Sequence, residues 1–152
     1  RFAMTGWRLG WAVGPEKLIA QMTKMQENIV ACAPLPAQHA GIEALNKRTD
    51  TNYIREEFQR RRDLIYDGIN AIDGLACRPV PATFYAFVDI GRTELRAEDF
   101  VYRLLDCRRV AVVHGSAYGG SRYDRYIRIA FTLEEEKLKE ALRRIRMFMA
   151  SL

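Results

Sequence analysis

Arg8 is the first residue in the chain whose setting suits a chemical role. It lies in the stretch Thr5-Gly6-Trp7-Arg8-Leu9-Gly10, with a glycine two residues before it and another two residues after it. Arginine is costly to bury without an anionic partner, and its planar guanidinium matches phosphate or carboxylate oxygens. The glycines let a ligand approach the backbone closely. The pattern indicates an anion-binding arginine; a structural arginine that caps carbonyl groups or pairs with a carboxylate is the alternative.

Arg128 is the second such residue, and it lies within the alternating segment Tyr126–Phe131. Successive side chains of a strand point to opposite faces, so Arg128 would share its face with Tyr126 and Ala130. Both faces of this strand are mostly apolar, which places the arginine on a half-buried face. An arginine there favours a bidentate anion, and the preceding glycine-rich loop His114–Asp124 could give the anion access. A structural salt bridge is the alternative interpretation.

The elements that would position these arginines follow from hydrophobic periodicity and from the breaks between periodic segments. Helices are predicted over Glu16–Ala31, Ala37–Leu45, Tyr53–Ile72, Glu98–Asp106 and Leu133–Leu152. Strands are predicted over Trp7–Val13, Thr83–Ile90, Val110–Val113 and Tyr126–Phe131. The polar break at 49–52 marks a boundary, after which the order of elements predicts a two-layer α+β domain.

Composition narrows the classes of function. The net charge is +5, but acidic residues precede basic ones along the helical segments, as in Glu56–Arg62, which favours solvated helix faces and no nucleic-acid partner. No apolar run reaches the roughly 20 residues that a membrane helix needs, so no membrane partner is expected. The three cysteines lack a disulfide framework and favour a reduced, cytoplasmic protein. No spacing of cysteine and histidine predicts a metal site.

The opening segment resembles a known signature. It is similar to the segment that follows the Schiff-base lysine in fold-type I, pyridoxal-phosphate-dependent class I/II aminotransferases of the aspartate aminotransferase family. The residues that fill every specified position of this signature after the lysine are Ala3, Met4, Gly6, Arg8, Leu9 and Gly10. The lysine itself would lie just before Arg1, so no catalytic residue is expected within this chain.

Two further segments resemble the same family. Gly115–Gly119, followed by Tyr126–Ile129, is similar to the family's Gly-Ser-Ala-Phe-Gly segment and its aromatic–aliphatic–arginine–aliphatic strand. Ala82–Phe87 is similar to the family's Gly-Ala-Phe-Tyr strand, with Ala82 in place of the usual glycine, and makes Tyr85 a candidate pocket residue. Tyr118 and Tyr123 are expected to be surface or packing residues.

The resemblance implies a cofactor, an architecture and roles for both arginines. The cofactor would be pyridoxal 5'-phosphate, with Arg8 on its phosphate and Arg128 on the substrate's α-carboxylate. Residues 1–50 would be the tail of the large α/β cofactor domain, and residues 51–152 the small two-layer α+β domain. The full-length enzyme would be a homodimer, with Ala31–Gln38 near the interface. The chain alone would be inactive.

The implied reaction moves an amino group between an amino acid, aspartate or a similar one, and a 2-oxo acid such as 2-oxoglutarate. Two alternatives remain open. One is a carbon–sulfur β-lyase of the same fold and cofactor. The other is a stand-alone basic anion-binding module that uses Arg128 and the run Arg60–Arg62. Without their sheet neighbours, residues 1–50 are expected to fray, rearrange or pair with another chain.

Overall fold

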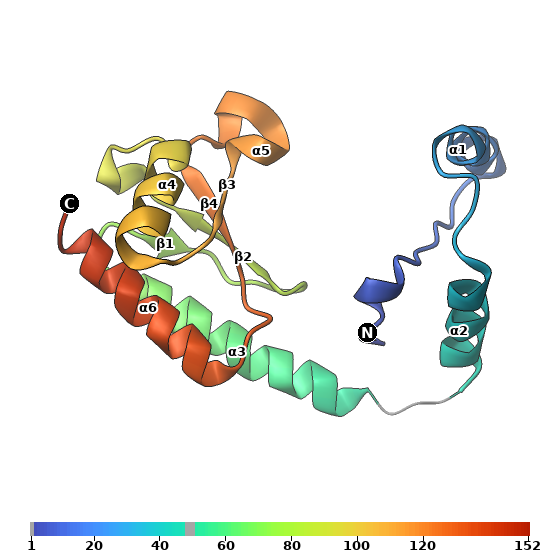
Figure 1. The fold of residues 1–152 in the computed structure, drawn as a ribbon, viewed down its shortest axis with the longest axis horizontal. Helices are drawn as coiled ribbons and strands as arrows, with labels where there is room; N and C mark the ends of the chain where they lie inside the picture. The colour runs from blue at the N-terminus through green and yellow to red at the C-terminus, as the bar shows by residue number, and fades with distance from the viewer. Residues whose placement is uncertain (1, 48–50) are drawn as a thin grey trace. The chain divides into compact units, whose positions relative to one another are not determined.

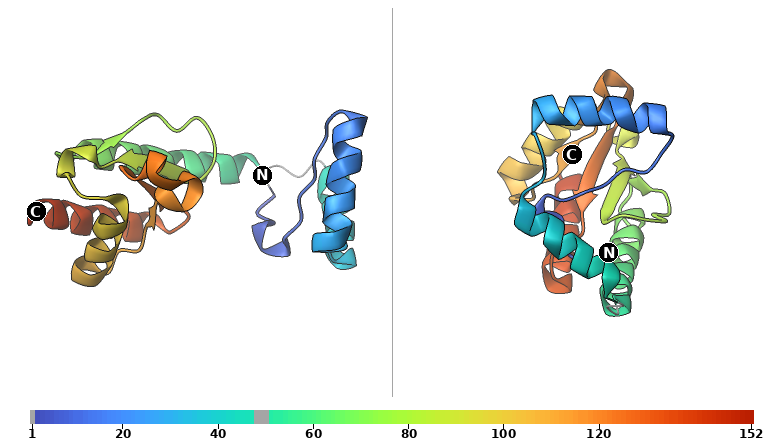
Figure 2. Two further views of the ribbon diagram at one scale, coloured as in Figure 1. Left: turned by 90° about the horizontal axis from the view of Figure 1, so that it is seen from above. Right: turned by 90° about the vertical axis from the view of Figure 1, so that its right-hand side faces the viewer.

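The computed structural model describes residues 2–47 and 51–152. The chain divides into two compact units, Arg1–Arg55 and Glu56–Leu152, which are described separately below. The first unit contains a short 3-10 helix η1 (Thr5–Trp7) and the helices α1 (Glu16–Ile29) and α2 (Leu35–Asn46) (Figure 1). Figure 2 shows α1 and α2 as separate helices that meet at a sharp bend, where Ala31 adopts a positive φ of 61°.

Prolines mark the starts of both helices. Pro15 and Pro34 are the N-cap residues of α1 and α2, and their extended backbone leads directly into each helix. Both predicted helices are confirmed, although α1 ends at Ile29 and α2 begins at Leu35. Inside the unit, α2 packs closely on the opening segment, because a Cβ added at Gly41 would lie only 2.4 Å from the Leu9 side chain.

The predicted strand Trp7–Val13 is wrong. Trp7 ends the 3-10 helix η1, and residues 8–13 are neither helix nor strand. A strand forms only where its backbone groups find a hydrogen-bonding neighbour, and within the described ranges no segment pairs with this one. Its apolar side chains are correspondingly open to solvent, with Trp11 65% and Val13 94% exposed.

The apolar stripe of α1 is also uncovered within the first unit. Leu18, Met22, Met25 and Ile29 recur at helical spacing, as predicted, and all four side chains are exposed. In a surface helix such a stripe normally faces a core. The first unit therefore holds an amphipathic helix whose apolar face has no cover in the described residues.

The second unit is a layer of helices packed on an antiparallel sheet. Its helices are α3 (Asn52–Asn70, which belongs to this unit from Glu56 on), α4 (Ala97–Arg108), the short α5 (Ser116–Gly119) and α6 (Glu135–Met149), with 3-10 turns η2 (Gly91–Thr93) and η3 (Gly120–Tyr123). Its strands are β1 (Ala76–Cys77), β2 (Tyr85–Asp89), β3 (Val113–His114) and β4 (Tyr126–Ala130), in the order β1-β2-β4-β3. The predicted two-layer α+β fold is confirmed.

The core lies on one face of this sheet. Ala86 and Val88 of β2 and Ile127 and Ile129 of β4 are buried there. The helices supply the opposing side chains, which include Ile65, Ile69, Phe100, Leu104, Leu138, Leu142, Ile145 and Phe148. Helices α3, α4 and α6 each bury residues at spacings of three or four, which is the periodicity of an amphipathic helix. Gly68 lets α3 approach α6 closely, because a Cβ there would lie 2.4 Å from Leu142.

Two details of the sheet differ from the prediction. Strand β1 is absent from the sequence interpretation; it has two residues, and its outer edge is closed by Asn70, which accepts from the Cys77 amide and donates to the Cys77 carbonyl at 2.9 and 3.1 Å. Burial raises the pKa of the Cys77 thiol. Strand β3 is Val113–His114 rather than Val110–Val113, and the predicted loop after it contains α5 and η3.

Candidate functional site

The candidate site lies on the sheet face opposite the core, which we call the open face. It is formed by Tyr85 and Phe87 of β2 and by Tyr126 and Arg128 of β4. Arg128 pairs with Phe87 on one side and with Val113 of β3 on the other, so it lies on an inner strand of the sheet. The prediction that Arg128 is half-buried on the face away from Ile127 and Ile129 is confirmed.

Two tyrosine rings flank the guanidinium of Arg128. Its Cζ lies 4.0 Å from the ring centroid of Tyr85 and 4.6 Å from that of Tyr118. Tyr85 projects from β2, diagonally across the strand pair, whereas Tyr118 projects from α5, which follows β3. The two rings thus come from opposite flanks of β4. The negative face of an aromatic ring attracts a cation within about 6 Å of its centroid, so both rings stabilise the charge of Arg128.

The hydrogen-bonding groups of Arg128 have no partner among the described residues. Its Nε is buried and makes no hydrogen bond, and none of the ion pairs in the described ranges includes Arg128. A buried donor without an acceptor costs free energy, so this arrangement favours a ligand that supplies acceptors. The two rings contact the guanidinium without taking a hydrogen bond from it, so its in-plane donors stay available. An incoming carboxylate supplies the acceptors that these donors need.

The neighbouring arginine on the same face is satisfied by a carboxylate of the chain. Arg125 donates to both oxygens of Asp89, at 3.1 and 2.6 Å, and this bidentate pair raises the pKa of Arg125. The rings of Phe87 and Tyr126 stack beside it, 5.0 Å apart and 14° from parallel. The open face therefore carries one arginine with an internal partner and one, Arg128, without.

The loop that holds Tyr118 depends on two glycines. Gly115 is buried, and a Cβ there would lie 2.5 and 2.8 Å from the backbone oxygens of Tyr123 and Tyr126. Gly120 adopts φ 63° and ψ −154°, a region that is nearly exclusive to glycine. Hydrogen bonds from Gly115 N to Tyr126 O, at 2.7 Å, and between His114 Nδ1 and Ser116 Oγ, at 2.8 Å, fix the loop's start. Local backbone geometry thus sets where Tyr118 lies.

Arg8, the other predicted anion-binding residue, belongs to the first unit. It is exposed and adopts a left-handed conformation with φ 53°. Its Nη1 donates to the Thr5 carbonyl at 3.2 Å, and it forms no ion pair with any described carboxylate. A Cβ built at Gly6 or Gly10 would meet nothing within 4 Å, so the surroundings of Arg8 are open. Its remaining donors are free to hold an anion such as a phosphate.

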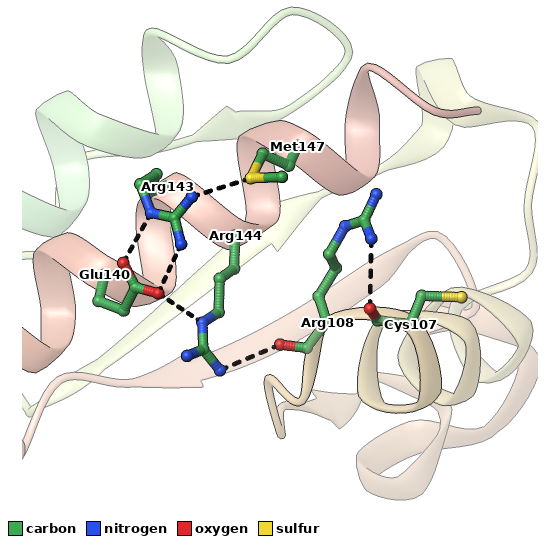
Figure 3. Close-up of polar contacts among 6 residues, drawn as sticks. All are labelled: Cys107, Arg108, Glu140, Arg143, Arg144 and Met147. Carbon is green, nitrogen blue, oxygen red and sulfur yellow. Dashed lines mark hydrogen bonds and ion pairs between the residues drawn. The ribbon is translucent and has the colours of Figure 1, made fainter.

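A second group of arginines lies between α4 and α6 (Figure 3). Glu140 accepts two hydrogen bonds from Arg143 and one from Arg144, each at 2.7 Å. These bonds lower the pKa of Glu140 to about 2. Arg144 also donates to the Arg108 carbonyl at 3.3 Å, which connects α6 to the end of α4. We call these four residues the α4–α6 arginine cluster.

Two further findings concern metals and membranes. Within residues 2–47 and 51–152, no group of three or more histidine, cysteine, aspartate or glutamate side chains is placed to hold a metal ion. None of the helices in these ranges combines the length and the apolar character needed to cross a bilayer. The three cysteines are free thiols, with Cys32 and Cys107 exposed and Cys77 buried.

Comparison with known proteins places this geometry in a family. The model of the family "Aminotransferase class I and II" matches residues 1–145. The chain belongs to this family. It is 43% identical to an aspartate aminotransferase of Rhizobium meliloti over 155 aligned residues, which cover 95% of this chain and 37% of that protein. It is 34% identical to a (5-formylfuran-3-yl)methyl phosphate transaminase of Methanocaldococcus jannaschii, covering 97% of this chain and 39% of that protein.

The fold agrees with solved structures of aminotransferases. The aromatic aminotransferase of Pyrococcus horikoshii superimposes with a TM-score of 0.85 at 35% sequence identity, over 99% of this chain and 40% of that structure. The chain thus spans less than half the length of the relatives that it matches. Those relatives are named for chemically different substrates, so family membership alone does not set the amino donor.

Sequence reasoning predicted the strand residues of this site, but it did not predict the contribution of the glycine-rich loop. It placed Arg128 on the correct strand face and pointed to Tyr85 as a pocket residue, and Tyr85 does flank Arg128. It predicted Tyr118 to be a surface or packing residue, and this side chain is 51% exposed. It did not predict the contact of the Tyr118 ring with the guanidinium of Arg128. The available signal was an aromatic residue inside a glycine-rich segment that precedes the arginine strand. The ligands assigned to Arg8 and Arg128, a cofactor phosphate and a substrate carboxylate, stay predictions.

Proposed function

We propose that this chain is the C-terminal part of a pyridoxal-phosphate-dependent aminotransferase, which moves an amino group between an amino acid, aspartate or a similar one, and a 2-oxo acid such as 2-oxoglutarate. The observation that carries the proposal is Arg128. It is held between two tyrosine rings on the open face, and no described carboxylate or carbonyl satisfies its donors. The family match over residues 1–145 supplies the chemistry.

Arg128 would fix the α-carboxylate of the substrate by a bidentate pair. A carboxylate held by two parallel hydrogen bonds has one orientation, and this restricts how the Cα–H bond of the amino acid is presented. Binding at this site also excludes water from the guanidinium plane, which strengthens the pair. The role of Arg128 is therefore positioning by charge and geometry.

Arg8 would hold the phosphate of the cofactor. Its exposed guanidinium and the open space at Gly6 and Gly10 fit a phosphate group. When bound, pyridoxal phosphate supplies an electron sink for the breaking Cα–H bond. The lysine that would attach the cofactor and move the Cα proton would lie immediately before Arg1, and this chain alone would be inactive.

The architecture and assembly of the enzyme are part of the same proposal. Residues 1–50 would end the large cofactor domain, and residues 51–152 would form the small domain. A homodimer would cover apolar surface around Ala31–Gln38, which is consistent with the exposed side chains of Val30 and Leu35, 59% and 64% exposed. The free thiols support a reducing compartment, which we take to be the cytoplasm.

Cofactor trapping in the full-length enzyme tests this proposal. The enzyme is incubated with pyridoxal phosphate, reduced with borohydride and digested, and the modified peptide is mapped by mass spectrometry. We expect one labelled lysine immediately before Arg1. Absence of any label would refute the cofactor assignment and favour a stand-alone anion-binding module, whereas a label on another lysine would refute the predicted position of the catalytic lysine. Product analysis then separates transamination, which yields a new amino acid, from a β-lyase reaction, which releases ammonia.

A further inference from the structure

The geometry points to Tyr118 as a positioning residue for the carboxylate-binding arginine. The guanidinium of Arg128 lies over its ring, with 4.6 Å between Cζ and the ring centroid. We infer that this ring keeps the guanidinium plane turned toward the open face, so that its two Nη groups meet a substrate carboxylate together. The inference rests on the proposed function, because it gives Tyr118 a role in binding the ligand of Arg128.

Tyr118 has no other structural role in the described chain that would explain its ring. It is 51% exposed and lies outside the hydrophobic core and its partly buried shell. Its hydroxyl makes no hydrogen bond with a described residue, and its only ring contact there is with Arg128. Within the described residues, the contact with the Arg128 guanidinium is therefore the one specific interaction of this side chain.

Tyr85 and Tyr118 contribute in different ways. Tyr85 is fixed by strand pairing and by the neighbouring ring of Phe84, whose centroid lies 4.5 Å away. Tyr118 lies on a four-residue helix whose position is set by Gly115 and Gly120. The arginine therefore has one ring from the rigid sheet and a second from a separate loop. Because Tyr118 takes no part in strand pairing, its removal should take away one of the two ring contacts of the guanidinium without disturbing the sheet.

The physical benefit is preorganisation. An unconstrained arginine side chain must lose rotamer freedom when it binds a carboxylate, and that loss weakens binding. Rings in contact with the guanidinium restrict those rotamers beforehand without competing for its in-plane hydrogen bonds. Because the aromatic ring provides this effect, a phenylalanine at position 118 should preserve carboxylate binding, whereas an aliphatic side chain of similar volume should weaken it.

The test uses the full-length enzyme with its cofactor and four variants: Tyr118→Phe, Tyr118→Leu, Arg128→Ala and Tyr102→Ala. Tyr102 is the matched control, because it is a tyrosine of the second unit with similar exposure, 56%, and no ring contact with an arginine. Binding of succinate, a dicarboxylate without an amino group, is measured by calorimetry. Values of kcat and KM and the melting temperature are measured for each variant.

We expect Tyr118→Leu to weaken succinate binding by about five- to thirtyfold and to raise KM by a similar factor, with kcat changed by no more than about twofold. Tyr118→Phe and Tyr102→Ala should bind succinate within about twofold of the parent. A structural role alone would lower the melting temperature without this change in affinity. Unchanged succinate binding in Tyr118→Leu, or equal weakening in Tyr118→Phe, would overturn the inference.

Arg128→Ala separates failure of this inference from failure of the proposed function. It should weaken succinate binding by about a hundredfold or more, because two charge-assisted hydrogen bonds are lost. If Arg128→Ala has this effect and Tyr118→Leu has none, only the role of Tyr118 is refuted. If Arg128→Ala leaves binding unchanged, the carboxylate site itself is refuted. If Tyr118→Leu does not fold, Tyr118→Ala is measured in its place against the same expectations.

Discussion

Arg128 and the α4–α6 arginine cluster show two ways in which this fold uses arginine. In the cluster, Arg143 and Arg144 share Glu140, so these two side chains are paired within the chain. Arg108 takes part through its carbonyl, and its own buried Nε has no partner among the described residues. On the open face, Arg128 is contacted by two tyrosine rings and by no described carboxylate. Rings stabilise the charge but leave its donors free, whereas a carboxylate uses them. Arg143 and Arg144 therefore use their donors within the fold, whereas the donors of Arg128 are available to a ligand.

The largest expected effect is on the affinity for a dicarboxylate, and it distinguishes Arg128 from an arginine of the α4–α6 arginine cluster. Arg128→Ala should weaken binding of a dicarboxylate to the full-length enzyme by about a hundredfold or more, with little change in melting temperature. Arg143→Ala should leave that binding unchanged, because Arg143 uses its donors on Glu140. Calorimetric titration of both variants measures the contrast. Equal losses of affinity would show that the two regions do not differ as described.

A substitution in the loop should produce an intermediate effect. Gly115→Val would place a Cβ 2.5 and 2.8 Å from two backbone oxygens, which cannot rotate away, so the loop must shift and carry Tyr118 from Arg128. We expect destabilisation of about 1–3 kcal/mol, as for overpacking elsewhere, together with weaker dicarboxylate binding. Gly14→Ala is the control, because its Cβ would lie at ordinary distances of 3.8 and 3.9 Å from side chains. Thermal unfolding measures stability, and calorimetric titration measures dicarboxylate affinity. If Gly115→Val matches Gly14→Ala in both, the loop does not position Tyr118 as described.

The smallest expected effect is a change in the pH dependence of stability when Glu140 of the α4–α6 arginine cluster is substituted. The hydrogen bonds from Arg143 and Arg144 lower the pKa of Glu140 from 4.5 to about 2. A carboxylate whose pKa is depressed by folding stabilises the fold above its unfolded pKa, and this contribution is lost as the pH falls through the folded pKa. Glu140→Gln should therefore unfold with a flatter pH dependence between about pH 4.5 and pH 2. Parallel pH profiles for variant and parent would disprove this linkage.

Periodicity was enough to predict most of the second unit. The buried residues Ile65 and Ile69 of α3 and Leu138 and Leu142 of α6 recur at helical spacing, and alternation in β4 placed Arg128 on the correct face. These signals are local in sequence and survive because the elements bury their faces within the same unit.

The features that sequence reasoning missed depend on contacts between different elements, which periodicity within one element does not predict. Strand β1 has two residues and is defined by pairing with β2 and by Asn70, neither of which leaves a periodic signal. Trp7–Val13 has the composition of a strand but lacks a neighbour to pair with among the described residues. The contact of Tyr118 with Arg128 joins a loop to a strand, and no spacing rule predicts it. Such contacts follow from the folded backbone.

A crystal structure of the full-length enzyme with pyridoxal phosphate and succinate would show which group Arg128 binds. We expect one carboxylate of succinate in the plane of the Arg128 guanidinium, at about 2.7–2.9 Å from its nitrogens, with the rings of Tyr85 and Tyr118 still in contact with the guanidinium. A structure in which Arg128 pairs with a protein carboxylate, while succinate binds elsewhere, would contradict it.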